Sequence, residues 1–396
     1  MLSRSIFTPW VEKTASRLAR GVDDIFCNTA LNPPKLMRAR SRAEGLDHAA
    51  RMRALSTIGA FYAPDDFLTR ESHFFPRPPA ISPLVTRRRS LGKQGEVVDL
   101  TWPTSFQPLW SSSAVAALLS EPVNEAHGAA QLPIDRSGEL AEKYQRAKRN
   151  STCHARWYRH HGGGRPCAVI LHGYMAGSYA VEERIWDVPG LFRLGIDVVV
   201  SVLPFHGPRR SEARGYLPPA FPSSDPRFTI EGFRQLVGDQ RALFAYLRGQ
   251  GVSDLGVMGM SLGGYAASLL ATLEPDLAFL VLFVPLASIE DFARTHGRFT
   301  GSSAQQTEQH LALRAAQRLV SPLARAPLIE KDRVLVIEGV SDLVTGPQHA
   351  EQLATHFGGK RVRFSGGHLL HFGRTEALRA VHQLLRDLKL TRETTS

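Results

Sequence analysis

The sequence predicts an α/β fold in which a mostly parallel central sheet is covered by helices. The first observation is a set of short, largely apolar runs, which are typical of strands that helices bury on both faces. These runs are Ala168–Leu171, Asp197–Leu203, Leu255–Met258, Phe279–Val284, Arg333–Ile337 and Arg361–Phe364. The second observation is a set of helical patterns between them, near residues 181–193, 229–248, 264–273, 348–356 and 375–388. Strand–helix alternation of this kind predicts parallel strands joined by helical crossovers.

Two β-rich runs precede this alternation. They are Glu96–Trp102 and Ala155–Arg159, and we expect them to be the first strands of the same sheet. The glycine-rich stretch His161–Gly164 that follows is predicted to form the turn of a hairpin. The Ser- and Pro-rich residues 103–135 are expected to form a loop.

The strand pattern divides the chain into four parts. Residues 1–94 are expected to form a mainly helical and loop-like extension, because proline-rich breaks interrupt them and no chemical motif is present. Residues 95–285 and 329–396 are predicted to be the two parts of the α/β core. Residues 286–328 are too long for a simple connection, so we expect them to form a helical cap insertion.

The first 20 residues set apolar side chains such as Trp10 and Leu18 among basic ones. This pattern predicts an amphipathic helix, and we expect its apolar face to dock on the protein's own core. Weak contact with an anionic membrane surface is the alternative interpretation. The continuous apolar region of a secretory signal is missing from this stretch.

The composition is that of a large globular protein, and it argues against several classes of partner. Of the 396 residues, 43% are hydrophobic, and the formal net charge is +11. Only eight of the 48 basic residues are lysine, and the basic residues form no run of five, so we expect no nucleic-acid partner. Three cysteines without a C-x-x-C pair favour a reducing, cytoplasmic compartment. No apolar stretch is long enough to span a bilayer.

The most informative motif is Gly259–Gly263, a G-x-S-x-G pentapeptide between a predicted strand and a predicted helix. This pattern is typical of a nucleophile elbow, a sharp turn that presents a serine side chain to a substrate. The flanking glycines allow the tight turn and the close packing of the helix. Ser261 is therefore the predicted nucleophile, and it needs a base within hydrogen-bonding distance to react near neutral pH.

The elbow, an earlier His-Gly pair after a strand, and an acid and a histidine after two later strands together resemble the α/β-hydrolase superfamily. The resemblance covers about residues 95–390, and the chain order Ser, Asp, His is the one that this fold uses. Asp342 follows the penultimate strand and His368 follows the last one. The resemblance therefore implies a catalytic triad of Ser261, Asp342 and His368.

Both of the later triad members have a competitor in the sequence. Glu338 lies close to Asp342, which could instead be an aspartate that caps a helix. His371 lies three residues after His368. We prefer His368 because the two glycines before it suit a loop that must turn back toward the elbow.

A tetrahedral intermediate carries its negative charge on one oxygen, which two backbone N–H groups usually stabilise. One of these donors is expected to be Leu262, the residue after the nucleophile. The resemblance implies that the other follows the strand Ala168–Leu171, and we choose Tyr174 from the H-G-x pattern, with Met175 as the alternative.

The stretch Leu203–Arg210 follows a strand whose carboxyl end is expected to lie beside this loop. It resembles an esterase-like branch of the superfamily that carries a Leu-Pro-x-His-Gly turn. Because ligands bind at the carboxyl ends of strands in open α/β sheets, His206 and Arg209 are candidate substrate-binding residues. Arg209 is suited to grip a phosphate or a carboxylate.

These observations predict a serine hydrolase that acts on a small-molecule or lipid-like carboxylic ester. Acyl transfer to an alcohol or amine uses the same triad and remains an alternative, as does cleavage of an amide or a thioester. A non-catalytic binding protein on the same fold is the alternative from another class. No cofactor is implied, and no H-E-x-x-H or Cys/His ligand spacing predicts a metal site.

Overall fold

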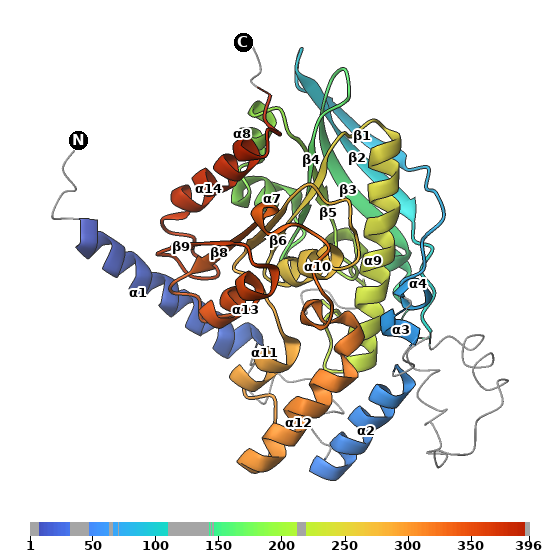
Figure 1. The fold of residues 1–396 in the computed structure, drawn as a ribbon, viewed down its shortest axis with the longest axis vertical. Helices are drawn as coiled ribbons and strands as arrows, with labels where there is room; N and C mark the ends of the chain where they lie inside the picture. The colour runs from blue at the N-terminus through green and yellow to red at the C-terminus, as the bar shows by residue number, and fades with distance from the viewer. Residues whose placement is uncertain are drawn as a thin grey trace.

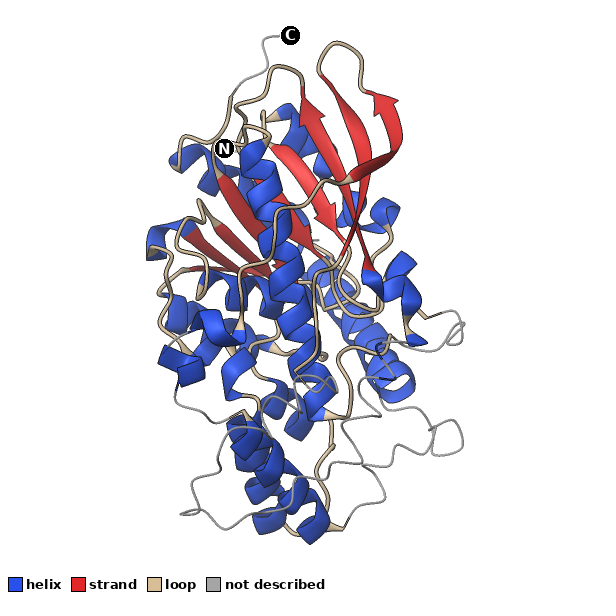
Figure 2. Cartoon of the chain, turned by 90° about the vertical axis from the view of Figure 1, so that its right-hand side faces the viewer, coloured by secondary structure: helices blue, strands red, loops and turns tan. Residues whose placement is uncertain are grey.

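The computed structural model describes residues 8–31, 47–62, 66–69, 71–109, 142, 144, 146–211 and 219–392. These residues form a nine-stranded sheet with helices packed around it (Figures 1 and 2). The strands are β1 Leu84–Ser90, β2 Gly95–Pro103, β3 Thr152–His160, β4 Cys167–Leu171, β5 Asp197–Ser201, β6 Leu255–Met260, β7 Leu280–Phe283, β8 Val334–Gly339 and β9 Lys360–Phe364. Their spatial order is β1-β2-β3-β5-β4-β6-β7-β8-β9.

The sheet is parallel from β5 through β4 to β9, and β1, β2 and β3 extend it as antiparallel strands. Every residue of β4, β5, β6, β7 and β8 is buried. This burial on both faces explains why these strands are continuous apolar runs in the sequence. The predicted mostly parallel, helix-covered sheet is confirmed. All parallel strands end at the same edge, which is where the elbow and the later loops meet.

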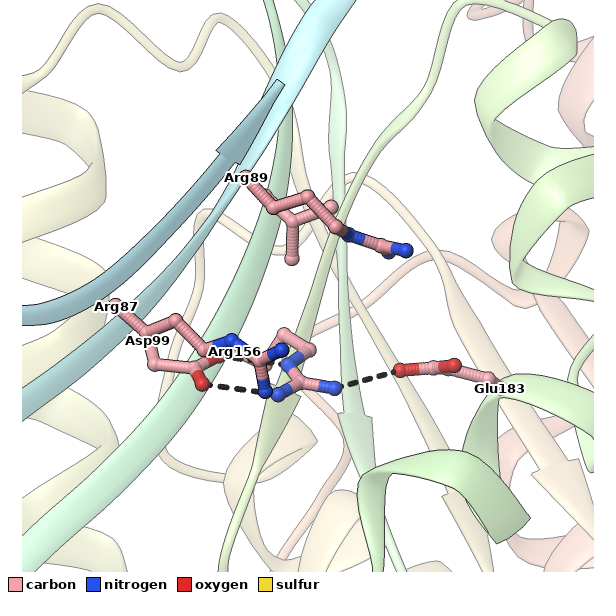
Figure 3. A pocket seen from close by; sticks show the side chains of 6 residues that line it. Arg87, Arg89, Asp99, Arg156 and Glu183 are labelled. Atoms are coloured by element: carbon pink, nitrogen blue, oxygen red, sulfur yellow. Dashed lines mark hydrogen bonds and ion pairs between the residues drawn. The ribbon is translucent and has the colours of Figure 1, made fainter. Parts of the chain in front are cut away.

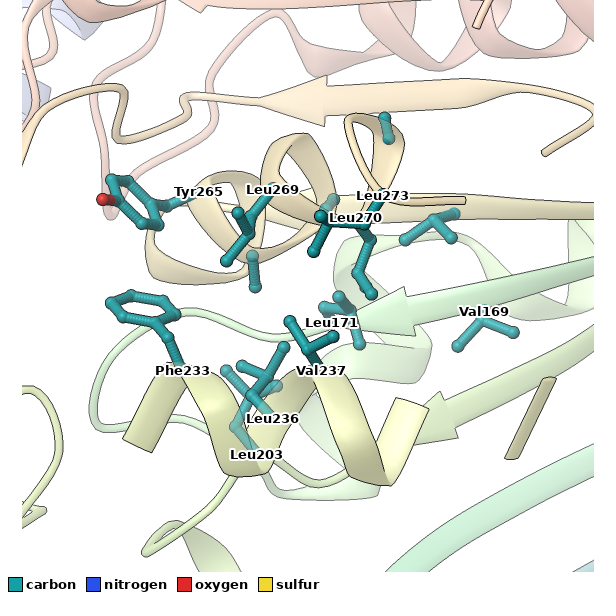
Figure 4. Close-up of a cluster of buried hydrophobic side chains, with 14 of the residues drawn as sticks. Val169, Leu171, Leu203, Phe233, Leu236, Val237, Tyr265, Leu269, Leu270 and Leu273 are labelled. Atoms are coloured by element: carbon teal, nitrogen blue, oxygen red, sulfur yellow. The ribbon is translucent and has the colours of Figure 1, made fainter. Parts of the chain in front are cut away.

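Two hydrophobic cores lie on the two faces of the sheet. Helices α9 (Pro226–Gly249), α10 (Leu262–Ala271) and α13 (Pro347–Phe357) contribute to one core, and α8 (Val188–Arg193) and α14 (Arg374–Asp387) to the other. Successive residues of β4 alternate between them, as strand geometry requires. Figure 4 shows side chains of α9, α10 and β4 meeting in the first core. Each fully buried Leu, Val or Phe stabilises the fold by about 1.5–3 kcal/mol.

The N-terminal helices pack at two separate places. The helix predicted in the first 20 residues is α1 (Thr8–Phe26), which continues as a π-helical turn over Cys27–Leu31 and hydrogen-bonds to the loops after β8 and β9. Helix α2 (His48–Phe61) instead lies beside α12 (Ser303–Ala316), as Figure 1 shows. Two short helices, α3 (Asp66–Thr69) and α4 (Glu71–Phe74), follow α2.

The predicted cap insertion contains two helices. They are α11 (Ile289–Thr295) and α12, and short 3-10 turns follow at Arg318–Val320 and Pro322–Ala324. The Arg51 guanidinium of α2 donates to the Gln309 side chain of α12 at 2.8 Å and to the Arg298 carbonyl at 3.1 Å. These bonds tie the N-terminal extension to the insertion.

The sheet starts earlier than the sequence patterns indicated. Strand β1 lies in the part of the chain that we expected to be helical or loop-like, and it pairs with β2. It was missed because all seven of its residues are exposed and three successive ones are arginines, so it shows no apolar pattern. Charged side chains on an edge strand oppose pairing with another chain.

The connections around β4 also differ from expectation. His161–Gly164 forms a turn, but it is not the turn of a hairpin, because β5 lies between β3 and β4. The single helix expected near residues 181–193 is broken into α7 (Tyr179–Ile185) and α8. The break lies at Asp187, whose left-handed backbone conformation cannot continue a helix. Its side chain caps α8 by accepting a hydrogen bond from the Gly190 N–H. The expected loop at 103–135 lies outside the described residues from 110 onward.

Candidate active site

The predicted nucleophile lies on a strained turn between β6 and α10. Ser261 has φ 55° and ψ −117°, a backbone conformation that costs a non-glycine residue about 1–3 kcal/mol and persists only where neighbours enforce it. The end of β7 supplies that support, since the Ser261 N–H donates to the Phe283 carbonyl at 3.1 Å. The Ser261 carbonyl accepts a hydrogen bond from the Leu286 N–H at 3.1 Å. The Ser261 side chain is thereby held at the carboxyl edge of the sheet.

The glycines of the motif are required by close approach of backbones. A Cβ at Gly259 would lie 2.1 Å from the Gly263 carbonyl oxygen. A Cβ at Gly263 would lie 2.0 Å from the Leu171 carbonyl oxygen at the end of β4. Neither clash involves a flexible side chain, so the start of α10 can approach β4 and β6 only because these two residues are glycine.

We expect Gly263→Ala to destabilise the protein by about 3 kcal/mol, because an added methyl group overpacks this contact and pushes α10 away from β4. Chemical unfolding in urea measures the change. Gly238→Ala is the matched control, since an added Cβ there, within α9, meets no atom within 4 Å. The control is expected to be neutral or stabilising. Equal stability of the Gly263→Ala variant and the wild type would contradict the packing argument.

Ser261, His368 and Asp342 form a hydrogen-bonded chain. The Ser261 Oγ lies 2.9 Å from His368 Nε2, and His368 Nδ1 lies 2.9 Å from Asp342 Oδ2. Because a carboxylate accepts, the Nδ1–H of His368 donates to Asp342, which leaves Nε2 to accept the hydroxyl proton of Ser261. All three side chains are buried.

Two backbone N–H groups and a hydroxyl hold the Asp342 carboxylate in place. Its Oδ1 accepts from the N–H groups of Val344 at 2.8 Å and Thr345 at 3.0 Å. The Thr345 hydroxyl donates to Oδ2 at 2.7 Å. Burial alone would raise the pKa of Asp342, but the charge of His368 and these hydrogen bonds lower it below its ordinary value. Asp342 is therefore ionised near neutral pH.

The same charges act on the histidine in the opposite direction. Burial alone would lower the pKa of His368, but the charge and hydrogen bond of Asp342, with a smaller effect of Asp23, raise it above its ordinary value. A histidine of this kind is a stronger base than one in water.

The two competitors have other partners. Glu338 is buried in β8 and pairs with Arg361 and Arg363 of β9. His371 donates from Nε2 to the His368 carbonyl at 2.8 Å, and burial lowers its pKa to about 4. His371 therefore stays neutral and supports the loop of His368.

The two predicted oxyanion-hole residues come from different segments, Leu262 from the start of α10 and Tyr174 from the loop after β4. Leu262 is the first residue of α10, so its N–H has no partner within that helix. Tyr174 follows β4, in a loop that passes directly beside the serine, since a Cβ at Gly173 would lie 3.4 Å from Ser261 Cβ. The alternative donor, Met175, has a left-handed backbone with φ 63°.

His172 fixes the loop that carries Tyr174. Its Nδ1 lies 2.8 Å from the Gly173 carbonyl, and its Nε2 accepts from the Leu203 N–H at 3.0 Å. Burial lowers the pKa of His172 to about 4, so the ring stays neutral and keeps both bonds across the pH range in which proteins usually work. It joins the loop after β4 to the loop after β5.

The structure does not bring the two predicted substrate-binding residues to an open surface. His206 is fully buried, and its ring packs against His172 and Tyr174. Arg209 is 1% exposed and donates to Asp239 at 2.8 Å. The charge that we expected to grip an anionic substrate is therefore neutralised inside the fold. The sequence stretch was misleading because a turn of this composition serves packing as well as binding.

Sequence reasoning missed two residues that hold the site. Thr345 supports Asp342, and its pattern, a hydroxyl three residues after an aspartate, is a local turn signal. Asp23 of α1 is fully buried and accepts hydrogen bonds from the N–H groups of Leu343, His368 and Leu369. No signal in the sequence links a residue in the first helix to these loops.

A separate polar pocket lies at the antiparallel side of the sheet (Figure 3) and contains none of the predicted site residues. Its lining residues are Arg87, Arg89, Val97, Asp99, Arg156 and Glu183. The Arg156 guanidinium donates to Asp99 at 2.6 Å and to Glu183 at 3.1 Å. The acidic groups of this pocket are thus already paired.

Neither a metal-binding cluster nor a membrane-spanning helix is present among the described residues. Among them, no group of three or more His, Cys, Asp or Glu side chains is arranged to hold a metal ion. In the same part of the chain, no helix combines the length and the apolar character needed to cross a membrane.

Relatives with sequence similarity match about half of the chain. No protein-family model matches the chain. Two uncharacterized proteins of Mycobacterium tuberculosis, from strains H37Rv and CDC 1551, are 34% identical to it over 215 residues. The matched region is 52% of this chain, and the chain spans about half, 51%, of the length of these relatives.

Solved structures resemble the chain over a larger part of its length. An acetyl xylan esterase from Thermoanaerobacterium has a TM-score of 0.52 and 17% identity, and it covers 83% of this chain and 94% of its own. An acetyl xylan esterase from Paenibacillus has the same TM-score and coverage at 15% identity. At this identity the similarity concerns the fold. With the strand order and the helices on both faces, it shows that the chain has the α/β-hydrolase fold.

Proposed function

We propose that this protein is a serine hydrolase that cleaves carboxylic esters through an acyl-enzyme on Ser261. The observation that carries the proposal is the buried hydrogen-bonded chain from Ser261 through His368 to Asp342. A hydroxyl that donates to a neutral imidazole, itself oriented by a carboxylate, is the arrangement that an activated serine needs. The similar acetyl xylan esterases support an ester as the substrate class.

In the first half of the proposed reaction, Ser261 Oγ attacks the ester carbonyl carbon while His368 Nε2 takes the hydroxyl proton. The carbonyl oxygen becomes an oxyanion, which the N–H groups of Leu262 and Tyr174 stabilise. Asp342 stabilises the imidazolium that forms. The bond to the alcohol oxygen then breaks, and His368 returns its proton to that oxygen, which leaves the acyl group on Ser261.

In the second half, water takes the place of the alcohol. His368 removes a proton from the water molecule, whose oxygen attacks the acyl carbon. Collapse of the second tetrahedral intermediate breaks the bond to Ser261 Oγ, which recovers its proton from His368. The products are a carboxylic acid and an alcohol, and the protein needs no cofactor for either half.

The surroundings of the acid loop are apolar. Val344 forms a small buried cluster with Cys27 and Leu31, and the partly buried rings of Tyr174 and Phe292 pack against it. These side chains favour a small or lipid-like ester over a highly charged one. The three buried thiols, Cys27, Cys153 and Cys167, form no disulfide, which supports a reducing, cytoplasmic location.

Labelling with a fluorophosphonate probe tests the proposal, because this reagent reacts with activated serines. The wild type is expected to label and His368→Ala is expected not to, since the serine then has no base. Hydrolysis of p-nitrophenyl esters of increasing acyl length then defines the preferred acyl group. A folded wild-type protein that neither labels nor hydrolyses any of these esters would refute the proposal and favour the binding-protein alternative.

A further inference from the structure

Helix α1 presents a narrow buried stripe to the rest of the protein. Ala19 and Asp23 of α1 and Cys27, the first residue of the π-helical turn that continues it, are buried and lie four residues apart, which places them on one face. Next to them on α1, Arg20, Gly21, Asp24 and Ile25 are exposed, whereas Val22 and Phe26 are half-buried. A carboxylate in the middle of such a stripe is costly to bury unless it is hydrogen-bonded.

The Asp23 carboxylate is hydrogen-bonded to both loops that carry the proposed acid and base. Its Oδ2 accepts from the His368 N–H at 2.7 Å and from the Leu343 N–H at 3.2 Å. Its Oδ1 accepts from the Leu369 N–H at 3.0 Å. Leu343 directly follows Asp342, so one side chain of α1 connects the backbone beside the acid to the backbone of the base itself.

The contact between α1 and the histidine loop is closely packed. A Cβ at Gly367 would lie 2.6 Å from Asp23 Oδ2 and 3.2 Å from Ala19 Cβ. The Ser16 hydroxyl adds a bond to the Ser365 carbonyl at 2.8 Å. This glycine was expected to let the loop turn back, and it also gives the carboxylate of α1 access to the backbone of the loop.

The end of the same segment reaches the surroundings of the serine. The Cys27 thiol lies 3.5 Å from the Leu343 carbonyl, and Cys27 and Leu31 form the cluster with Val344 that Tyr174 packs against. The segment thus contacts the acid loop, the base loop and the predicted oxyanion loop.

We infer that Asp23 is a positioning residue, which holds the loops of Asp342 and His368 in the register that the hydrogen-bonded chain requires. The inference rests on the proposed hydrolase function. It differs from a role in stability alone, because Asp23 bonds to the amide of His368 itself. Rotation or shift of that residue by about 1 Å would misplace Nε2 relative to Ser261, a displacement that costs about 10²-fold in rate.

Asp23→Asn is the first test, with Asp24→Asn as the matched control on the exposed side of α1. An amide supplies one acceptor oxygen and points its NH₂ at backbone N–H groups, so the bonds to the two loops cannot all form. We expect kcat for a p-nitrophenyl ester and the rate of fluorophosphonate labelling to fall roughly 10- to 100-fold. KM should change less than about twofold, since the binding surface stays in place. The control should behave as the wild type.

A second readout follows the loops directly. Hydrogen–deuterium exchange should increase at the amides of Leu343, His368 and Leu369 in Asp23→Asn and stay unchanged in the control. If Asp23→Asn does not fold, Gly367→Ala takes its place, because its methyl group would displace the Asp23 carboxylate without altering that residue.

The outcomes separate the inference from the function on which it rests. A variant with a lower melting temperature but wild-type kcat, measured well below that temperature, would mean that Asp23 only stabilises the fold and would overturn the inference. A wild type without labelling or ester hydrolysis would refute the proposed function itself, and faster exchange in the variant would still show that Asp23 holds the loops.

Discussion

Ser261→Ala is expected to abolish fluorophosphonate labelling and to lower kcat for ester hydrolysis by about 10⁶-fold. In the proposed mechanism this side chain supplies the atom that forms the acyl-enzyme, and no other hydroxyl is placed at 2.9 Å from His368 Nε2 in the described part of the chain. The remaining rate would come from substrate binding and the oxyanion donors alone. Steady-state hydrolysis of a p-nitrophenyl ester measures the loss, and circular dichroism checks the fold.

Ser268→Ala is the matched control for this loss. Ser268 lies on α10, the helix that follows Ser261. It is fully buried, and its hydroxyl donates to the Gly264 carbonyl at 2.8 Å. Like Ser261→Ala, this variant loses a buried serine hydroxyl. We expect it to lower the stability of the protein but to leave fluorophosphonate labelling complete. Labelling that persists in Ser261→Ala would show that another residue is the nucleophile.

Asp342→Asn is expected to lower kcat by about 10⁴-fold while the protein stays folded. The amide NH₂ of asparagine favours the imidazole tautomer with the proton on Nε2, so that His368 no longer accepts from Ser261. Asp332→Asn is the control, because Asp332 is an exposed acid that lies just before β8, whereas Asp342 lies just after it. Similar losses in both variants would argue against a special role of Asp342.

The same substitution has a signed effect on the pH dependence. His368 must be neutral to act as a base, so kcat/KM rises with pH through its pKa. Burial lowers this pKa, and Asp342 together with Asp23 raises it above the ordinary value of 6.5. The acid limb of the wild type is therefore expected above pH 6.5, and Asp342→Asn should move it to lower pH. A shift to higher pH would contradict the assignment of the raised pKa to Asp342.

The parts of this fold that follow from local pattern were predictable from the sequence. Continuous apolar runs identify the buried parallel strands, because only helices on both faces can cover them. The elbow is a local motif, since its strand, turn and helix are adjacent in the chain. Chain order then pointed to Asp342 and His368 as its partners, and the structure places both within hydrogen-bonding distance of one another.

The parts that depend on contacts between distant segments were not predictable. Asp23 contacts residues in the last loops of the sheet, and nothing near it in the sequence marks it as buried. Arg209 was expected to face a ligand, but its partner Asp239 lies 30 residues away on α9. Strand β1 is exposed along its whole length, so its pairing with β2 shows no apolar pattern.

The bond between the Asp23 carboxylate and the His368 amide has a consequence for biosynthesis. It joins residues 345 positions apart, and contacts of such separation form late because closing a long loop costs entropy first. Helix α1 leaves the ribosome long before the histidine loop exists, and its carboxylate remains in water until then. The proposed nucleophile therefore stays without its base until the loop after β9 has been translated, and products truncated before that loop are expected to be inert.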